Sequence, residues 1–202
     1  TDLIVLSKVL SILNTFSIFA KSVEYMKQNL IERQGYSERI ERMFGKGMVV
    51  ALTGQRRVGK SCVMKRIYEK YSQDSHNNVI YIDMEKTAFA DITNYENLEA
   101  YVAERLDSSK DNYLFIDEVQ EIQNFEKAIL SLQSDGSCQI MVTGSNAKML
   151  SSELSTRLRG RYIGYHIHGL DYEEFIEFHN LQDNDESLGM FLQYGGLPQL
   201  RQ

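Results

Sequence analysis

Apolar runs and apolar stripes alternate along most of the chain. Short runs of consecutive apolar residues predict strands that are buried on both faces, and they occur at residues 48–53, 79–83, 113–116 and 139–143. Between these runs, apolar residues recur three and four positions apart, which predicts helices with one buried face. The helices are expected at residues 61–71, 94–107 and 125–132, and a fifth strand at residues 161–167. The pair Asn77-Asn78 is typical of a turn before the second strand.

The order of these elements predicts the fold class. Strands that alternate with helices of about 10–15 residues form βαβ units, and such units build a parallel sheet with helices on both faces. We therefore expect an α/β domain, with a parallel sheet of about five strands, over residues 46–168. Residues 1–45 are predicted to form an N-terminal helical segment, and residues 169–202 are predicted to begin a C-terminal helical lid.

The N-terminal segment contains an apolar stretch, Leu3–Ala20. Lys8, Asn14 and several hydroxyl residues interrupt it, whereas a helix that spans a membrane needs about 20 mainly apolar residues. We expect a soluble amphipathic helix or a terminal segment foreign to the domain, and a weak membrane tether stays open. The chain begins at Thr1 and stops at Gln202, which we interpret as the ends of a fragment trimmed inside its lid.

Charge and cysteine content narrow the class of protein. The chain of 202 residues carries a net charge of −6, which argues against a protein that coats nucleic acid. Its two cysteines fit a reducing, cytoplasmic location better than a disulfide scaffold. Basic residues nevertheless form two clusters, typical either of a bound polyphosphate or of solvated helix faces. One cluster contains Arg56, Arg57, Lys60, Lys65 and Arg66, and the other contains Arg157, Arg159 and Arg161.

The first basic cluster coincides with a phosphate-binding pattern. Residues 54–61 read Gly-Gln-Arg-Arg-Val-Gly-Lys-Ser, match G-x-x-x-x-G-K-[ST] in full, and join a predicted strand to a predicted helix. Glycines allow such a loop to bend around an anion with its N–H groups pointing inward, and the helix N-terminus adds a positive field. Lys60 is expected to reach the β- and γ-phosphates, and Ser61 to hold Mg²⁺. We assign these residues to nucleotide binding: Gly54, Gln55, Arg56, Arg57, Val58, Gly59, Lys60, Ser61 and Cys62.

Two adjacent carboxylates end the third predicted strand, in the sequence Leu114-Phe-Ile-Asp117-Glu118. Asp117 is expected to hold Mg²⁺, directly or through water, because this ion prefers hard oxygen ligands. Glu118 is one residue further, so its side chain points differently and can orient or deprotonate an attacking water.

Polar residues also end the fourth predicted strand, in the sequence Thr143-Gly-Ser145-Asn146. Ligands of open α/β sheets lie beyond the carboxyl ends of the strands, so these groups are expected to face the γ-phosphate, with Asn146 as a candidate catalytic residue. A cap at the start of the next helix explains Ser145 or Asn146 equally well.

With these motifs the sequence resembles the AAA-type ATPase domain of the bacterial and archaeal AAA_14–DUF4143 group, whose members place a family-specific domain after the ATPase. The resemblance covers roughly residues 26–200 and also rests on Leu158-Arg-Gly-Arg161, Leu170-Asp-Tyr-Glu-Glu-Phe175 and Tyr194-Gly-Gly-Leu-Pro198. It implies ATP as the nucleotide, and it implies Arg159 or Arg161 as a catalytic contact to the γ-phosphate. Arg161 fits equally a strand-start residue that pairs with a carboxylate.

We therefore predict an ATPase that hydrolyses ATP to ADP and phosphate with Mg²⁺ and relays a conformational change to a C-terminal domain. A small-molecule or nucleoside kinase and a non-hydrolysing nucleotide switch are the alternatives. A GTPase is disfavoured because Thr143-Gly-Ser-Asn-Ala, and not an N-K-x-D-like segment, follows the fourth strand. A homo-oligomer, and a protein or nucleic-acid partner bound through the C-terminal domain, stay open.

Overall fold

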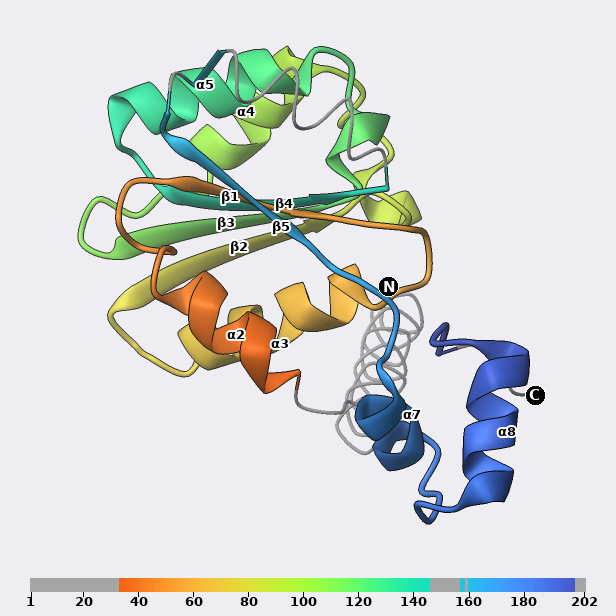
Figure 1. Cartoon of the computed structure of the whole chain (residues 1–202). Coiled ribbons are helices and arrows are strands. Elements are labelled where there is room, and N and C mark those ends of the chain that lie inside the picture. The colour runs from red at the N-terminus through yellow and green to blue at the C-terminus, as the bar shows by residue number, and fades with distance from the viewer. Residues whose placement is uncertain (1–32, 146–156, 159, 199–202) are drawn as a thin grey trace, which may run out of the picture.

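A parallel sheet forms the centre of the structure (Figure 1). A computed structural model describes residues 33–145, 157–158 and 160–198. Within them the strands are β1 (Val49–Thr53), β2 (Asn77–Asp83), β3 (Asp111–Asp117), β4 (Gln139–Gly144) and β5 (Tyr162–His166). They are all parallel and lie in the order β2-β3-β4-β1-β5. This confirms the predicted α/β fold with a five-stranded parallel sheet.

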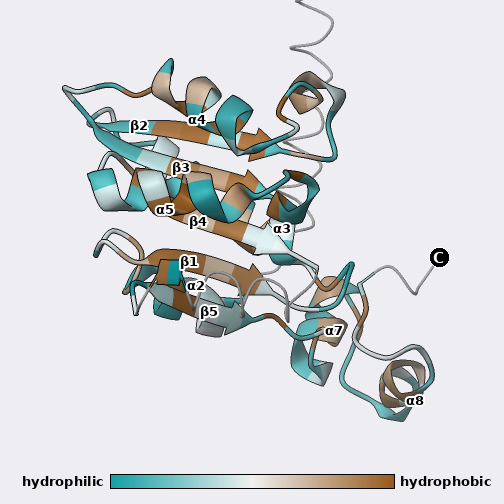
Figure 2. Cartoon of the chain, turned by 90° about the horizontal axis from the view of Figure 1, so that it is seen from above, coloured by the Kyte–Doolittle hydropathy of each residue, from teal (hydrophilic) through white to brown (hydrophobic). Residues whose placement is uncertain are grey.

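Among the described residues, two pairs of helices cover the sheet. Helices α2 (Gln34–Glu41) and α3 (Lys60–Ser72) lie on one face, and α4 (Tyr95–Ala103) and α5 (Phe125–Asp135) lie on the other (Figure 1). Alternate residues of one strand supply both cores: in β1, Ala51 packs with the α4 and α5 side, and Leu52 packs with the α2 and α3 side. Burial on both faces explains why β1, β4 and the later parts of β2 and β3 are mostly hydrophobic, whereas the edge strand β5 is only partly buried and less hydrophobic (Figure 2).

Two further helices, α7 (Tyr172–Phe178) and α8 (Asp185–Tyr194), lie to one side of the sheet (Figure 1). They pack on each other through aromatic rings: the Phe191 ring centroid lies 5.6 Å from that of Tyr172 and 5.3 Å from that of Phe175. Two short 3₁₀ helices, η1 (Thr87–Phe89) and η2 (Val119–Glu121), follow β2 and β3.

The predicted turn at Asn77-Asn78 is wrong, because both residues belong to β2. These two residues begin β2, and each of their side-chain amides has a hydrogen-bond partner. Asn77 Nδ2 donates to the Tyr71 carbonyl at 2.9 Å, and Asn78 Nδ2 donates to Asn112 Oδ1 at 2.7 Å. The polar side chains are therefore satisfied while their backbone pairs with β3.

The helix predicted from Asn94 to Asp107 ends early, at Ala103. Its beginning is as predicted, since Asn94 is the N-cap and its side chain accepts a hydrogen bond from the Asn97 backbone. At the other end, the Asp107 N–H donates to Asn112 Oδ1 at 2.9 Å instead of to a helical carbonyl. A side chain of the next strand thus competes with continuation of the helix.

The apolar stretch Leu3–Ala20 lies outside the described residues. Along the part of the chain that the structure does describe, no helix has both the length and the apolar character needed to cross a membrane.

Candidate functional site

The loop between β1 and α3, residues 54–59, begins at a position where the backbone leaves no room for a side chain. Gly54 has φ of 142°, and a Cβ at this position would lie 2.2 Å from the Ile167 carbonyl oxygen. Gly59 has φ of 98° and precedes Lys60, the first residue of α3. Both glycines of the phosphate-binding pattern therefore stand where φ is positive, and Gly54 in addition lies against the residue that follows β5.

The Lys60 ammonium lies inside this loop. The residue is only 4% exposed, and Nζ donates to the carbonyls of Gly54 at 3.2 Å and Gln55 at 3.1 Å. Burial lowers the pKa of Lys60, and the nearby carboxylates of Glu118 and Asp117 oppose that shift. The cation thus stands between the loop backbone and the two predicted acidic residues.

Hydroxyl groups surround the Asp117 carboxylate at the end of β3. Ser61 Oγ donates to Asp117 Oδ1 at 3.0 Å, the Thr143 hydroxyl donates to the same oxygen, and the Tyr81 hydroxyl donates to Oδ2 at 3.4 Å. Burial raises the pKa of Asp117, whereas the hydrogen bonds from Thr143 and Ser61 oppose this shift. The negative charge of Asp83, on the neighbouring strand β2, raises the pKa of Asp117 further.

Glu118 is held in a conformation that is uncommon outside glycine. Its φ is 55°, in the left-handed region, and its backbone N–H donates to Thr143 Oγ1 at 3.0 Å. Gln120 Nε2 donates to Glu118 Oε2, while Gln120 Oε1 is buried and has no hydrogen-bond partner among the described residues. The Thr143 side chain was expected to face a phosphate, but it is fully buried and its hydroxyl orients Asp117 and Glu118 instead.

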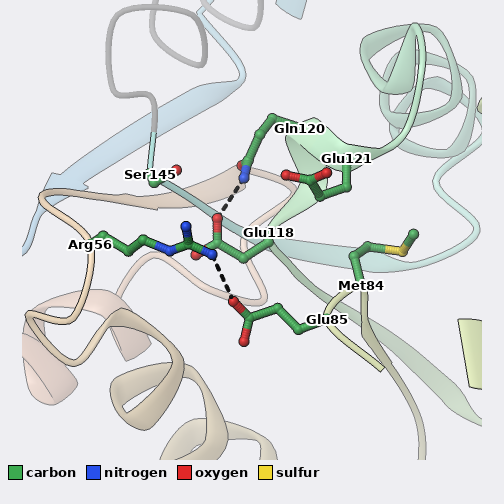
Figure 3. Close-up of a pocket in the computed structure, with 7 residues that line it drawn as sticks. All are labelled: Arg56, Met84, Glu85, Glu118, Gln120, Glu121 and Ser145. Carbon is green, nitrogen blue, oxygen red and sulfur yellow. Dashed lines mark hydrogen bonds and ion pairs between the residues drawn. The ribbon is translucent and has the colours of Figure 1, made fainter. Parts of the chain in front are cut away.

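A cleft of about 370 Å³ opens beside Glu118, where β2, β3 and β4 end (Figure 3). Arg56 enters it from the loop after β1, and Arg56 Nη2 lies 3.3 Å from Glu85 Oε1. The cleft therefore combines one guanidinium with several carboxylates. Its lining residues are Arg56, Met84, Glu85, Glu118, Gln120, Glu121 and Ser145.

The structure brings together the predicted residues of the first two motifs, but not all of the others. Ser145 lines the cleft. Arg161 lies just before β5, where its carbonyl accepts a hydrogen bond from Val49, so the length of β1 separates it from the loop at residues 54–59. This position is at odds with a contact between Arg161 and a phosphate held by its own chain. Asn146 and Arg159 lie outside the described residues.

The structure links to this site three residues for which no role was predicted from the sequence. Tyr81 and Gln120 bond the two carboxylates, and Arg33 bonds the Val58 carbonyl inside the loop. Of the three, only Gln120 stands close in sequence to a predicted site residue, two positions after Glu118.

Comparison with known proteins places this arrangement in a family. The sequence model of the AAA_14 family, described as an AAA domain, matches residues 46–176. An uncharacterized protein of Haemophilus influenzae is 28% identical over 181 residues, and one of Methanocaldococcus jannaschii is 29% identical over 163 residues. These alignments cover 86% and 75% of this chain but only 45% and 36% of the two relatives. The chain therefore spans less than half the length of the curated relatives it matches.

Solved structures with the same fold include proteins that carry nucleotides. The Saccharomyces cerevisiae Hsp104–ADP complex aligns with a TM-score of 0.61 at 15% identity, over 85% of this chain and 29% of that one. AMPPCP-bound DnaA from Aquifex aeolicus aligns with a TM-score of 0.55 at 16% identity, over 85% and 60%. Cdc6p from Pyrobaculum aerophilum aligns with a TM-score of 0.56 at 10% identity, over 75% and 49%. At such identities the likeness shows the fold alone.

Proposed function

Since the chain belongs to the AAA_14 family of AAA domains, we propose that it is a P-loop ATPase that binds ATP with Mg²⁺ and hydrolyses it to ADP and phosphate. One observation carries the proposal. The hydrogen bond of 3.0 Å from Ser61 Oγ to Asp117 Oδ1 joins the phosphate-binding pattern at residues 54–61, the phosphate loop, to the acidic end of β3. The two residues are 56 positions apart in the sequence. Lys60 lies buried beside this link, so a cation, a hydroxyl and a carboxylate converge at one edge of the sheet.

The oxygens of Ser61 and Asp117 fit a Mg²⁺ ion. Both are hard donors, they already lie within hydrogen-bond distance of each other, and burial of Asp117 raises its pKa in a way that a neighbouring cation would reverse. Bound there, Mg²⁺ would neutralise part of the charge on the β- and γ-phosphates.

Lys60 and the loop backbone would bind the phosphates of ATP. The Lys60 ammonium now donates to the carbonyls of Gly54 and Gln55, and it would exchange these bonds for phosphate oxygens. The guanidinium of Arg56, from the same loop, extends into the cleft and is 75% exposed on its side chain. It would pair with a phosphate oxygen in place of Glu85.

Glu118 is our candidate for the residue that orients or deprotonates the attacking water. Its carboxylate lines the cleft, and Gln120 donates to one oxygen, which leaves the other oxygen to accept from a water. Gln120 Oε1, which is buried and has no hydrogen-bond partner among the described residues, is a further acceptor at this position. Asn146 and Arg159 remain proposed contacts to the γ-phosphate.

The longer protein is expected to do more than the ATPase domain does alone. Since the two relatives are more than twice as long as the aligned region, we propose that hydrolysis drives a conformational change relayed to a C-terminal domain. A cytoplasmic location is proposed because Cys62 and Cys138 are free thiols. We also propose that the protein forms a homo-oligomer and binds a protein or nucleic-acid partner through the C-terminal domain.

The binding half of the proposal is tested by titrating ATP and Mg²⁺ into wild-type protein and Lys60→Ala in a calorimeter. Loss of a buried, hydrogen-bonded charge should weaken binding by about thirtyfold or more. Lys70→Ala is the control, because it removes a lysine from the exposed last turn of the same helix. Retained affinity in Lys60→Ala would contradict the assignment of the phosphate loop.

The hydrolysis half is tested by phosphate release from wild type, Glu118→Gln and Glu121→Gln. Glu118→Gln should keep its ATP affinity but release phosphate about 100-fold more slowly, because it cannot accept the proton of a water. Glu121→Gln is the matched control from the exposed wall of the same cleft. ATP binding without turnover at any protein concentration would favour the non-hydrolysing switch, and turnover that needs an added hydroxyl acceptor would favour the kinase.

A further inference from the structure

Arg33, immediately before α2, is a buried arginine whose guanidinium makes five hydrogen bonds. Two of them form a bidentate ion pair with Glu174 in α7, at 2.8 Å to Oε1 and 2.9 Å to Oε2. Two more reach the carbonyls of His168 at 2.9 Å and Gly169 at 3.1 Å. The fifth reaches the Val58 carbonyl at 3.3 Å, inside the phosphate loop. The Arg33 side chain is only 7% exposed.

These bonds join three segments that are far apart in sequence: the phosphate loop, the residues after β5, and α7. The planar guanidinium has enough donors, in fixed directions, to serve all three segments at once, and lysine does not. Glu174 has a second task, because its Oε2 also accepts from the Asp171 N–H and so completes the capping box of α7. The same carboxylate thus starts α7 and attaches it to Arg33.

A second contact fastens the C-terminal segment to the same region. The Leu170 N–H donates to the Gly196 carbonyl at 2.6 Å, and Leu197 packs against the hydrophobic cluster that contains Val58. Residues 168–197 therefore form a closed segment, with α7 and α8 inside it, whose two ends both meet the neighbourhood of the phosphate loop.

We infer that Arg33 is a positioning residue that couples the phosphate loop to α7, so that nucleotide binding and docking of residues 168–178 strengthen each other. This inference rests on the proposed ATP site. Phosphates that take over the Lys60 ammonium from the carbonyls of Gly54 and Gln55 change the loop in which Val58 lies. Arg33 carries that change to Glu174, and by linkage a docked α7 favours the nucleotide-bound loop by the same factor.

The test is hydrogen exchange of the α7 backbone amides, with and without a non-hydrolysable ATP analogue and Mg²⁺. In wild type the analogue should slow exchange by about fivefold or more, the lower end of ordinary coupling between two sites. In Arg33→Met this ratio should fall towards one, and affinity for the analogue should weaken by the factor that wild type showed. A purely structural role for Arg33 would instead speed exchange in both states and leave the ratio unchanged, which would overturn the inference.

Matched variants keep the result interpretable. Arg33→Met leaves the Glu174 carboxylate without its cation, so circular dichroism must first show that the variant is folded. Glu174→Gln and Arg33→Lys remove fewer contacts and should both lower the ratio, with Arg33→Lys intermediate. Glu173→Gln is the control, since it neutralises the exposed neighbour in the same turn of α7 and should keep the wild-type ratio.

Two failures are distinguishable in this experiment. A wild-type chain that binds no analogue would overturn the proposed ATP site, and the coupling with it. A wild-type chain that binds the analogue while its α7 exchange stays unchanged would overturn the coupling alone.

Discussion

Asp117 is a buried carboxylate whose hydrogen bonds, among the described residues, come from hydroxyl groups. Ser61, Thr143 and Tyr81 each donate to it, and burial raises its pKa above the ordinary value for aspartate. Neutral donors stabilise the ionised form less than a cation does. This environment costs the free protein stability, and it suits the Mg²⁺ ligand that we propose Asp117 to be.

Asp117→Asn should consequently stabilise the free chain at neutral pH. The folded chain holds the Asp117 proton at pH values where the unfolded chain, with a pKa of about 3.9, has lost it. The contribution of this group to the free energy of unfolding therefore falls as pH rises from about 4. We expect Asp117→Asn to unfold at a higher urea concentration than wild type at pH 7, with a difference that shrinks towards pH 4.

The measurement is urea unfolding between pH 4 and 7.5 in the presence of a chelator. Asp111→Asn, at the exposed start of the same strand, serves as the control and should show a much smaller difference. A wild-type chain that is more stable than Asp117→Asn at pH 7, with metal removed, would contradict the prediction.

At the scale of single residues, the sequence predicts the site residues whose positions depend on their neighbours in the sequence. Short motifs at the ends of strands contain Lys60, Ser61, Asp117 and Glu118, so the local backbone decides where these residues lie. Arg33 shows why other contacts stay hidden, since its ion-pair partner is 141 positions away and only the folded sheet brings the two together.

At the scale of elements, β1, β3 and β4 were predictable because their buried residues coincide with apolar runs in the sequence. Helix ends depend on competing side chains, as the early end of α4 shows. The closure between the residues after β5 and the residues after α8 depends on glycine for a different reason. A Cβ on Gly196 would lie 2.0 Å from the Leu170 carbonyl oxygen, so the backbones meet where no side chain fits.

Gly196→Ala should therefore open this closure. The new methyl group overlaps a backbone atom, and neither backbone can move away without breaking the bond from the Leu170 N–H to the Gly196 carbonyl. We expect a loss of about 1–3 kcal/mol in the free energy of unfolding, as for other overpacked sites, and faster proteolysis within residues 168–198. Thermal unfolding and timed digestion measure the two effects.

Gly189→Ala is the matched control inside α8. A Cβ at Gly189 meets nothing within 4 Å, so alanine should stabilise the helix by about 0.5–1 kcal/mol. Equal effects of the two substitutions, in sign and size, would show that the close approach at Gly196 does not matter.

At the scale of the whole molecule, the parallel sheet has two different edges. Because every strand runs the same way, the carboxyl ends bring the phosphate loop, Asp117 and Glu118 together. Arg161 lies at the opposite edge, beside the amino ends of the strands, where its Nη1 lies 3.5 Å from Gln133 Oε1 of α5. A residue at that edge acts on a nucleotide only if a neighbouring copy of the chain holds it.

Arg161→Ala should for this reason leave the ATP affinity of dilute protein unchanged within about twofold, as expected of a surface substitution. Arg56→Ala, which removes the guanidinium inside the cleft, should weaken affinity by about tenfold because it deletes a charged partner of the phosphates. Binding of a fluorescent ATP analogue measures the affinity of both variants, and phosphate release is followed over a range of protein concentrations.

Equal losses of affinity in dilute Arg161→Ala and Arg56→Ala would contradict the position of Arg161. A rate defect of Arg161→Ala that grows with protein concentration would mean that one copy completes the site of the next, because the sheet keeps Arg161 away from its own.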